Sequence, residues 1–214
     1  MRPILITSGA TRNPIDAIRY LSAQAGGSTA IRIASCLEPE RNITLLASRE
    51  VALRGAGEGI TFRCEEFSST RDLMTRMKGW IERNPGGIVV HSAAVGDYEI
   101  ATDTPDGNLE TKIPSGQAEW VLRLRPTPKI LDHLKSWSPD LFVVSFKAAA
   151  PGTDDEELLA RARAQQERTN SDLVLANVLG RLTSRVLILG EKPTWFETRE
   201  AALATLIETI RETG

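Results

Sequence analysis

The stretch ILITSGATRNPIDAIRYLSAQAGGST, residues 4–29, sets the pattern for the rest of the chain. It opens with the apolar run Ile4–Ile6, which predicts a short buried strand. Small residues follow at Ser8–Thr11, and a second small cluster, Ala25–Thr29, opens a periodicity that predicts a helix as far as Leu37. A strand, a small-residue turn and a helix start often bind phosphate, because bare N–H groups and the positive helix end face the anion. The spacing matches neither the dinucleotide fingerprint nor the P-loop, so an ordinary strand-to-helix turn is the alternative.

The composition is typical of a soluble globular protein. The 214 residues are 41% hydrophobic and 25% charged, and this length predicts one domain over residues 1–214. The net charge of −2 gives no basic field that would recruit nucleic acid. No apolar run reaches the ~20 residues of a membrane-spanning helix, and the N-terminus lacks a signal-peptide pattern. We therefore expect a cytoplasmic protein without nucleic-acid or membrane partners.

The two cysteines indicate neither a disulfide framework nor a metal site. Cys36 falls in a predicted helix and Cys64 in a predicted strand, and neither has partner ligands at metal spacing. We expect both to be reduced core residues, and we expect no metal-binding side chains.

Strands and helices alternate along the chain, which predicts an α/β fold with a mostly parallel, Rossmann-like sheet and helices on both faces. Glycines at 55, 57 and 59 predict a loop, and polar, turn-rich residues at about 101–117 predict a mobile flap. Further strands are predicted at 42–48, 60–64, 88–90, 120–125, 141–146 and 173–177, a C-terminal hairpin at 185–196, and helices at 73–81, 128–137, 154–168 and 199–211.

Ligands of such sheets bind beyond the carboxyl ends of the strands. Three stretches are expected at that edge, namely Gly9–Arg12, Ser48–Glu50 and Ala93–Tyr98. The small side chains of Ala93 and Ala94 would let a ligand touch the backbone there. The sequence therefore predicts a binding site at this edge of the sheet.

Three basic residues are candidates for binding an anionic group. Arg12 and Arg19 follow the first strand, and a guanidinium pairs bidentately with carboxylate or phosphate. The alternative makes Arg12 a turn residue and Arg19 a solvated helix residue. Lys112 lies in the predicted flap, where it could close over a phosphate or simply face solvent.

Other candidates stand at the ends of later strands. Asp97 could contact a ligand or cap a turn, and Phe146 could stack on a base or pack in the core. Asn177 offers amide donors and acceptors to a ligand. The two histidines, His91 and His133, lie on different elements, and no catalytic triad or metal-ligand motif is visible. Backbone N–H groups with Arg, Lys and Asp suit phosphoryl or nucleotidyl transfer, in which charge stabilisation dominates.

Five ordered motifs resemble the phosphopantothenate–cysteine ligase family in its stand-alone form. They cover about residues 3–190, and each is weak alone, whereas the set in this order is specific. The motifs are ITSGATRNPID with RYLS at 6–22, SAAVGDY at 92–98, KIPS at 112–115, VSFK at 144–147 and LANVL at 175–179.

The resemblance implies a homodimer with shared active sites and a two-step reaction. The carboxylate of 4′-phosphopantothenate attacks the α-phosphorus of ATP or CTP, with Mg²⁺, and pyrophosphate leaves. The amine of cysteine then displaces the nucleotide and forms the amide. The resemblance assigns nucleotide binding to Gly9, Gly26, Gly27, Ser28, Ala93, Asp97, Phe146 and Lys147, substrate binding to Arg19, Ala94 and Asn177, and catalysis to Lys112 and Arg19.

Two positions depart from the family pattern. Ala23 stands where the family has an Asn thought to bind the substrate carboxylate, and Ser28 stands where it has a basic residue. Losing one preorganised donor can cost ~10²–10³ in rate. A degenerate member that binds nucleotide or a pantothenate-like acid without ligating it is therefore a second hypothesis. A nicotinamide-dependent oxidoreductase on the same fold is a third, although G-x-G-x-x-G is absent.

Overall fold

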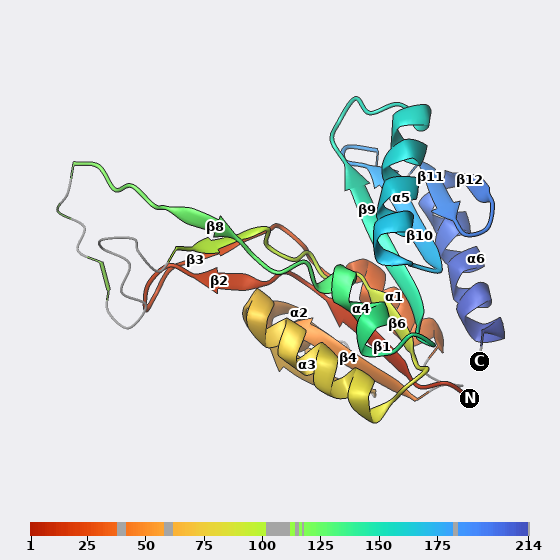
Figure 1. Ribbon diagram of the computed structural model, residues 1–214, viewed down its shortest axis with the longest axis horizontal. Helices are drawn as coiled ribbons and strands as arrows, with labels where there is room; N and C mark the ends of the chain where they lie inside the picture. Colours follow the sequence, from red (N-terminus) through yellow and green to blue (C-terminus); the bar gives the residue numbers. More distant parts are fainter. Residues whose placement is uncertain are drawn as a thin grey trace.

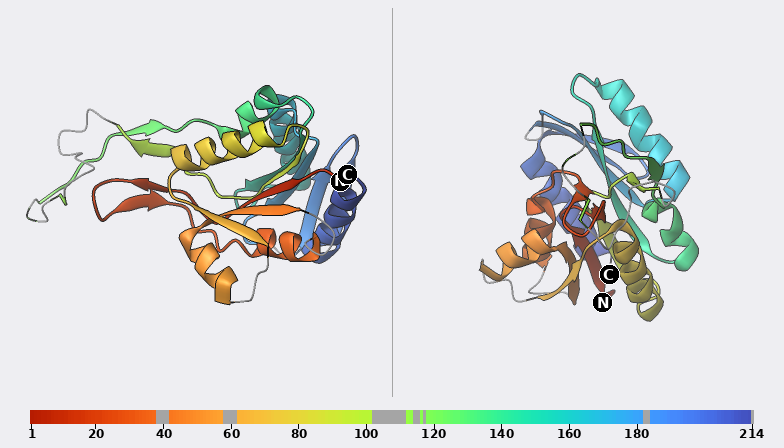
Figure 2. Two further views of the ribbon diagram at one scale, coloured as in Figure 1. Left: turned by 90° about the horizontal axis from the view of Figure 1, so that it is seen from below. Right: turned by 90° about the vertical axis from the view of Figure 1, so that its left-hand side faces the viewer.

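The computed structural model describes residues 1–37, 42–57, 62–101, 112–113, 116, 118–181 and 184–213. Within these residues the main sheet has eight strands in the order β12-β11-β10-β9-β6-β1-β4-β5 (Figures 1 and 2). Strands from β5 to β10 in this order pair in parallel, whereas β11 and β12 add antiparallel pairs at one edge. The strands are β1 (Ile4–Ser8), β4 (Ile43–Ser48), β5 (Arg63–Phe67), β6 (Ile88–His91), β9 (Phe142–Ala149), β10 (Leu173–Val178), β11 (Ser184–Leu189) and β12 (Pro193–Thr198).

Helices cover both faces of the sheet, as the alternating sequence pattern predicts (Figure 2). On one face, α1, α2 and α6 pack against inward side chains such as Ile6 and Val90. On the other face, α3, η2 and α4 form a second core, and α5 forms a third over β9 and β10. The helices are α1 (Ser28–Leu37), α2 (Arg49–Gly57), α3 (Thr70–Arg83), the 3₁₀ helix η2 (Ile130–His133), α4 (Leu134–Trp137), α5 (Asp155–Thr169) and α6 (Arg199–Glu212). Every helix among the described residues is too short or too polar to cross a membrane.

Side-chain caps fix the starts of three helices. Ser69 accepts a hydrogen bond from the Asp72 N–H at α3, and Asp154 and Thr198 cap α5 and α6 in the same way. Each cap satisfies a donor that the first turn of a helix leaves free. Helix starts therefore follow the short polar residues that end the preceding loops.

Two antiparallel ribbons form an arm that projects from the body. In β2 and β3, Arg12–Pro14 pairs with Tyr20–Ser22, and in β7 and β8, Tyr98–Ile100 pairs with Leu124–Pro126. Figure 1 shows both ribbons reaching away from α5 and α6. Their shared contacts are a small apolar cluster of Ile15, Ile100 and Ile113, against which Leu21, Trp120 and Leu122 pack.

Two of the expected elements were wrong. The glycine loop is partly helix, because Gly55 and Gly57 end α2, which Val51 anchors in the core. In place of the strand expected at 120–125, the structure has the shorter strand β8 at Leu124–Pro126. Trp120 and Leu122 instead pack against the apolar cluster of the arm. The expected positions Gly59, Ile60 and Thr61 lie outside the described residues, as does most of the flap.

The cysteines are both exposed, so the expectation that they belong to the core was wrong. Helix α1 buries Ile33, Ala34 and Leu37, which leaves Cys36 on the outer side. Strand β5 lies at the edge of the sheet, and its Cys64 faces solvent. Both are free thiols, as expected.

Candidate functional site

The carboxyl ends of the parallel strands meet at one edge, and the stretches after β1 and β6 are joined there. Ala10 and Ala94 form an isolated parallel bridge. The Thr11 N–H donates to the Ala94 carbonyl at 3.1 Å, and the Ala94 N–H donates to the Gly9 carbonyl at 2.8 Å. Two of the three stretches expected at this edge therefore lie side by side, and the arm begins from them.

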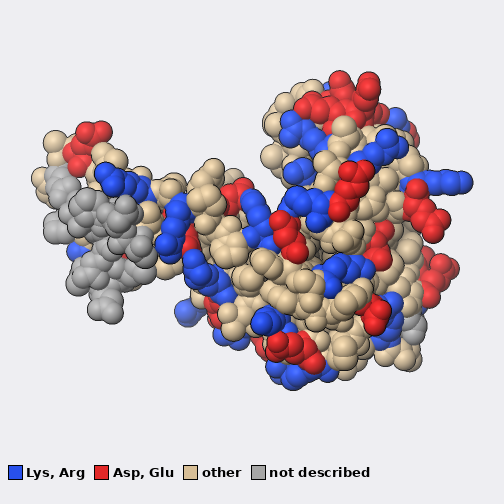
Figure 3. Space-filling view, in the orientation of Figure 1, with Lys and Arg blue, Asp and Glu red and all other residues tan. Residues whose placement is uncertain are grey.

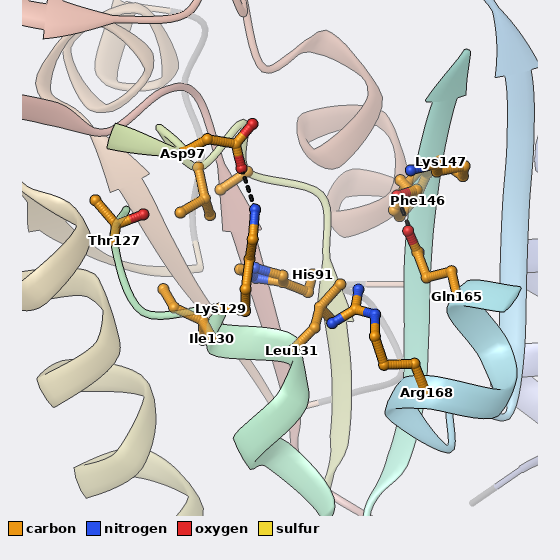
Figure 4. Close-up of a pocket in the computed structure, with 12 residues that line it drawn as sticks. His91, Asp97, Thr127, Lys129, Ile130, Leu131, Phe146, Lys147, Gln165 and Arg168 are labelled. Carbon is orange, nitrogen blue, oxygen red and sulfur yellow. Dashed lines mark hydrogen bonds and ion pairs between the residues drawn. The ribbon is translucent and has the colours of Figure 1, made fainter. Parts of the chain in front are cut away.

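A cavity of about 240 Å³ opens beyond β6 and β9. It lies between the residues after β6, helix η2 and helix α5 (Figure 4). In the space-filling view, charged side chains of both signs border the hollow between the base of the arm and α5 (Figure 3). The lining residues are His91, Ala93, Val95, Asp97, Thr127, Lys129, Ile130, Leu131, Phe146, Lys147, Gln165 and Arg168.

An ion pair and hydrogen bonds join the residues that follow β6, at the rim of the cavity, to the residues that precede η2. The Asp97 carboxylate forms an ion pair with Lys129 across the opening (Figure 4). The Thr127 N–H donates to the Asp97 carbonyl at 2.9 Å, and the Thr127 hydroxyl donates to the Gly96 carbonyl at 2.6 Å. These bonds hold one acidic and one basic side chain at the mouth.

Helix α5 supplies a buried polar group to the opposite wall. Gln165 lies on the inward stripe with Leu158, Ala162 and Thr169. Its Nε2 donates to the Ser145 hydroxyl at 3.0 Å and to the Phe146 carbonyl at 3.2 Å. This contact fixes β9 beside the cavity, which Phe146 and Lys147 line, while the Phe146 side chain also packs against the core on the α1 and α6 face of the sheet.

His91 ends β6 and is buried against Thr7 of β1. Its Nδ1 lies 2.9 Å from the Thr7 hydroxyl, which also accepts the Ala93 N–H at 3.0 Å. Burial lowers the pKa of His91 to about 4, because the charged imidazolium is poorly solvated there. The ring is therefore neutral at physiological pH.

The glycine turns around α1 are required by close packing. Gly9 and Gly27 have φ of +85° and +71°, which residues with a Cβ rarely adopt. A Cβ on Gly27 would meet the Ser8 hydroxyl and would lie 2.6 Å from Val51 Cγ2. Gly26 is open, with no atom closer than 3.8 Å to such a Cβ. Contacts within the protein thus account for Gly9 and Gly27 without a bound anion.

Asn177 lies on the same edge but next to α1 and α6. Its Oδ1 accepts from Arg199 Nη1 at 3.1 Å, and Arg199 Nη2 donates to the Thr29 hydroxyl at 3.0 Å. Burial lowers the pKa of Arg199, which has no carboxylate partner among the described residues. The Nδ2 of Asn177 is buried and likewise lacks a partner in the described part of the chain. Ser28, Thr29 and Arg199 line a separate hollow there.

Asp16 organises the candidate catalytic residues on the arm. Its carboxylate accepts from Arg19 Nε at 2.9 Å, from the Ile113 N–H at 3.1 Å and from the N–H groups of Ile18 and Arg19. Chiefly because of the Arg19 guanidinium, the pKa of Asp16 lies well below its usual range. Arg19 also stacks over the Trp120 ring at 4.5 Å and donates to the Ile113 carbonyl at 2.8 Å. Lys112, next to Ile113, is exposed.

Ala23 lines a shallow pocket between the arm and α2. Gln24 lines the same pocket, as do Arg12 and Tyr20. Arg12 forms an ion pair with Glu50 and stacks over the Tyr20 ring at 4.7 Å. Arg12 is therefore engaged within the chain, in β2 rather than in a turn.

The structure gathers only part of the predicted site. Ala93, Asp97, Phe146 and Lys147 line one cavity, whereas Arg19 and Lys112 lie on the arm and line no part of it. Sequence reasoning missed several lining residues, namely Thr127, Lys129, Gln165 and Arg168. A polar Gln165 in the inward stripe of an otherwise amphipathic helix was the available signal.

The parallel sheet with a cavity beyond its strand ends defines an α/β protein of the Rossmann-like class. Within that class, the chain belongs to the family described as the DNA/pantothenate metabolism flavoprotein C-terminal domain, whose model matches residues 1–193.

Curated relatives carry related names. The chain is 34% identical over 191 residues to the coenzyme A biosynthesis bifunctional protein CoaBC of Thermococcus kodakarensis, covering 87% of this chain and 44% of the relative. It is 30% identical over 182 residues to the phosphopantothenate–cysteine ligase of Mus musculus, covering 80% and 56%. The chain thus spans about half the length of these relatives.

Solved structures share the fold. The DNA/pantothenate metabolism flavoprotein from Streptococcus pneumoniae matches all of both chains with a TM-score of 0.84 at 22% identity. A Cab2 mutant in complex with phosphopantothenate-cysteine matches with a TM-score of 0.76 at 18% identity, covering 99% of this chain and 88% of that one.

Proposed function

We propose that this chain ligates 4′-phosphopantothenate to cysteine through an acyl-nucleotidylate, with ATP or CTP as the nucleotide. The observation that carries the proposal is the cavity beyond β6 and β9, because four of the residues expected to bind nucleotide line it together. Membership of the pantothenate-metabolism family and the name of the mouse relative support the same reaction.

The cavity residues suit a nucleotide. Lys147 supplies positive charge for phosphate, and Lys129 and Arg168 add to it, although they form ion pairs with Asp97 and Asp132 in the single chain. Mg²⁺ would accompany the triphosphate. Such an ion is held mainly by phosphate oxygens and water with one or two carboxylates, and Asp97 is the carboxylate at the mouth.

The arm carries the residues for the acyl transfer. Asp16 holds Arg19 next to the segment that carries Lys112, and these two residues are the proposed cations for the charge that develops in the transition state. In the first step the substrate carboxylate forms a bond to the α-phosphorus and pyrophosphate leaves. In the second step the cysteine amine forms the amide and the nucleoside monophosphate leaves.

A homodimer would bring the arm of one protomer to the cavity of its partner. Arg19 and Lys112 lie away from the cavity in the single chain, and the arm exposes large apolar side chains to solvent. Such exposed apolar surface favours association. The exposed residues, with their exposed fractions, are Ile18 (62%), Tyr20 (47%), Tyr98 (52%), Val121 (67%) and Leu124 (45%).

Product analysis by mass spectrometry tests the reaction. Phosphopantothenate, cysteine and Mg²⁺ are supplied with ATP or CTP, and the amide product with AMP or CMP is expected. Pyrophosphate without amide would instead support the second candidate, a member that no longer completes ligation. Ala23, at the position where the family has an Asn, is the observation that favours this alternative.

Mixing two inactive variants tests the shared site. Arg19→Ala removes one cation of the arm, and Phe146→Ala changes a residue that lines the cavity. If each site takes its arm from the partner, random mixing restores about a quarter of wild-type activity, because half of the dimers regain one site. A mixture that stays inactive would argue that the sites are not shared.

A further inference from the structure

His91 is the buried polar side chain of the cavity that the proposed reaction leaves without a role. It is 5% exposed, ends the central strand β6 and lines the cavity together with Lys129 and Gln165 (Figure 4). Its Nε2 makes no hydrogen bond to any residue that the structure describes, whereas Nδ1 contacts Thr7. A ring nitrogen of a cavity-lining residue that has no partner in the described chain is free to bond to a ligand in that cavity.

The hydrogen bonds of the Thr7 hydroxyl indicate which nitrogen of the His91 ring carries the proton. The Thr7 oxygen accepts the Ala93 N–H at 3.0 Å. Its only other hydrogen-bond partner in the described chain is His91 Nδ1, at 2.9 Å. A hydroxyl has one proton to donate, and Nδ1 is the acceptor within reach. This pairing favours the tautomer in which Nδ1 is unprotonated and the neutral ring carries its proton on Nε2.

The proton on Nε2 points away from Thr7, because the two ring nitrogens lie on opposite sides of the imidazole. In this tautomer, a ligand that approaches the ring from the side away from Thr7 meets a neutral N–H donor. The cavity is also lined by Lys129, Lys147 and Arg168, whose charges suit phosphate rather than a neutral nucleoside. A neutral donor instead matches the acceptor atoms of a nucleoside.

We propose that the Nε2–H of His91 donates a hydrogen bond to an acceptor atom of the nucleoside bound in this cavity. The inference rests on the proposed nucleotide-dependent function and adds a nucleoside-binding residue to it. Thr7 is a positioning residue, because it holds the ring in the tautomer that donates.

Two substitutions of His91 distinguish the effect of its hydrogen-bond donor from the effect of losing the imidazole ring. In His91→Gln, the side-chain Nε2 keeps a neutral donor near the position of the imidazole Nε2. In His91→Leu the donor is lost. Titration calorimetry with ATP and with CTP should show affinity within about twofold of wild type for His91→Gln. For His91→Leu we expect roughly a 5–10-fold loss, the range of one neutral hydrogen bond. Equal affinity of His91→Leu and wild type, or equal losses in both variants, would overturn the proposal.

Nitrogen-15 NMR of the wild-type protein tests the tautomer without any cavity variant. The chain has two histidines, so a His133→Asn variant assigns both rings. We expect a protonated Nε2 on His91 and a shift of that proton when nucleotide is added. A protonated Nδ1, or an Nε2–H signal that nucleotide does not move, would refute the inference.

The outcomes distinguish this inference from the proposed function. If wild type binds nucleotide and forms product while His91→Leu binds equally well, only the role of His91 fails. If wild type binds nucleotide through His91 but forms no amide, the ligase function fails and the nucleoside contact stands. If wild type binds neither nucleotide, both fail.

Discussion

Acidification should destabilise the protein through His91, and substitution of this residue should remove the effect. Burial lowers the pKa of His91 to about 4, against 6.5 as the ordinary value. Between these values the unfolded chain binds more protons than the folded chain, so the free energy of unfolding falls as the pH falls. The linkage relation gives a loss of about 2 kcal/mol between pH 7 and pH 5, and about 3 kcal/mol by pH 4.

Urea unfolding followed by tryptophan fluorescence measures this loss. Wild type and His91→Gln are compared at pH 7 and pH 5, and the difference between their pH responses isolates the one group. With an m-value of about 2 kcal/mol/M, the wild-type midpoint should fall by roughly 1 M more than that of the variant. The carboxylate of Asp16, whose lowered pKa stabilises the fold until the pH falls below the usual carboxyl range, is present in both proteins and cancels.

His133→Gln is the matched control, because it removes the other histidine and keeps His91. This variant should lose stability on acidification as the wild type does. Parallel pH responses of wild type and His91→Gln would refute the reasoning, since the buried imidazole would then carry no penalty for its charge.

Three further outcomes are expected. Gly27→Ala should lower the free energy of unfolding by about 1–3 kcal/mol in urea titrations, because the positive φ and the nearby Val51 resist a Cβ, whereas Gly26→Ala should change it little. Ala23→Asn should raise the rate of amide formation by up to ~10²-fold if a missing donor limits the reaction, and an unchanged rate would reject that explanation. Asp16→Asn should lower the ligation rate while circular dichroism stays native, because the neutral amide no longer holds the arm cations together; full activity would show that this anchor is dispensable.

The fold was predictable wherever apolar runs were long enough to need burial. The strands at 43–48, 88–91, 142–149 and 173–178 follow such runs closely. The arm was not predictable, because each strand of its ribbons has three residues and the pairing depends on partners elsewhere in the chain. Helix α2 was missed because its glycines outweighed the single anchoring residue Val51 in local reasoning.

The candidate site was predictable only where its residues follow buried strands. Asp97 and Phe146 follow buried strands, and the parallel topology alone brings strand ends to one edge. Gln165 and Lys129 come from elements whose approach to the cavity depends on tertiary packing. His91 had no recognisable sequence signal, since its significance lies in the hydroxyl of Thr7, 84 residues earlier.

The order of the strands has a consequence for synthesis of the chain. Strand β1 is made first but lies in the middle of the sheet, and Ile4 pairs with Ile43 on one side and Ile88 on the other. At typical translation rates, the second partner leaves the ribosome roughly 2–9 s after the first, since it lies about 45 residues later. During this interval one edge of an apolar strand is bare, and nascent chains stalled before Ile88 should be the ones that need a chaperone.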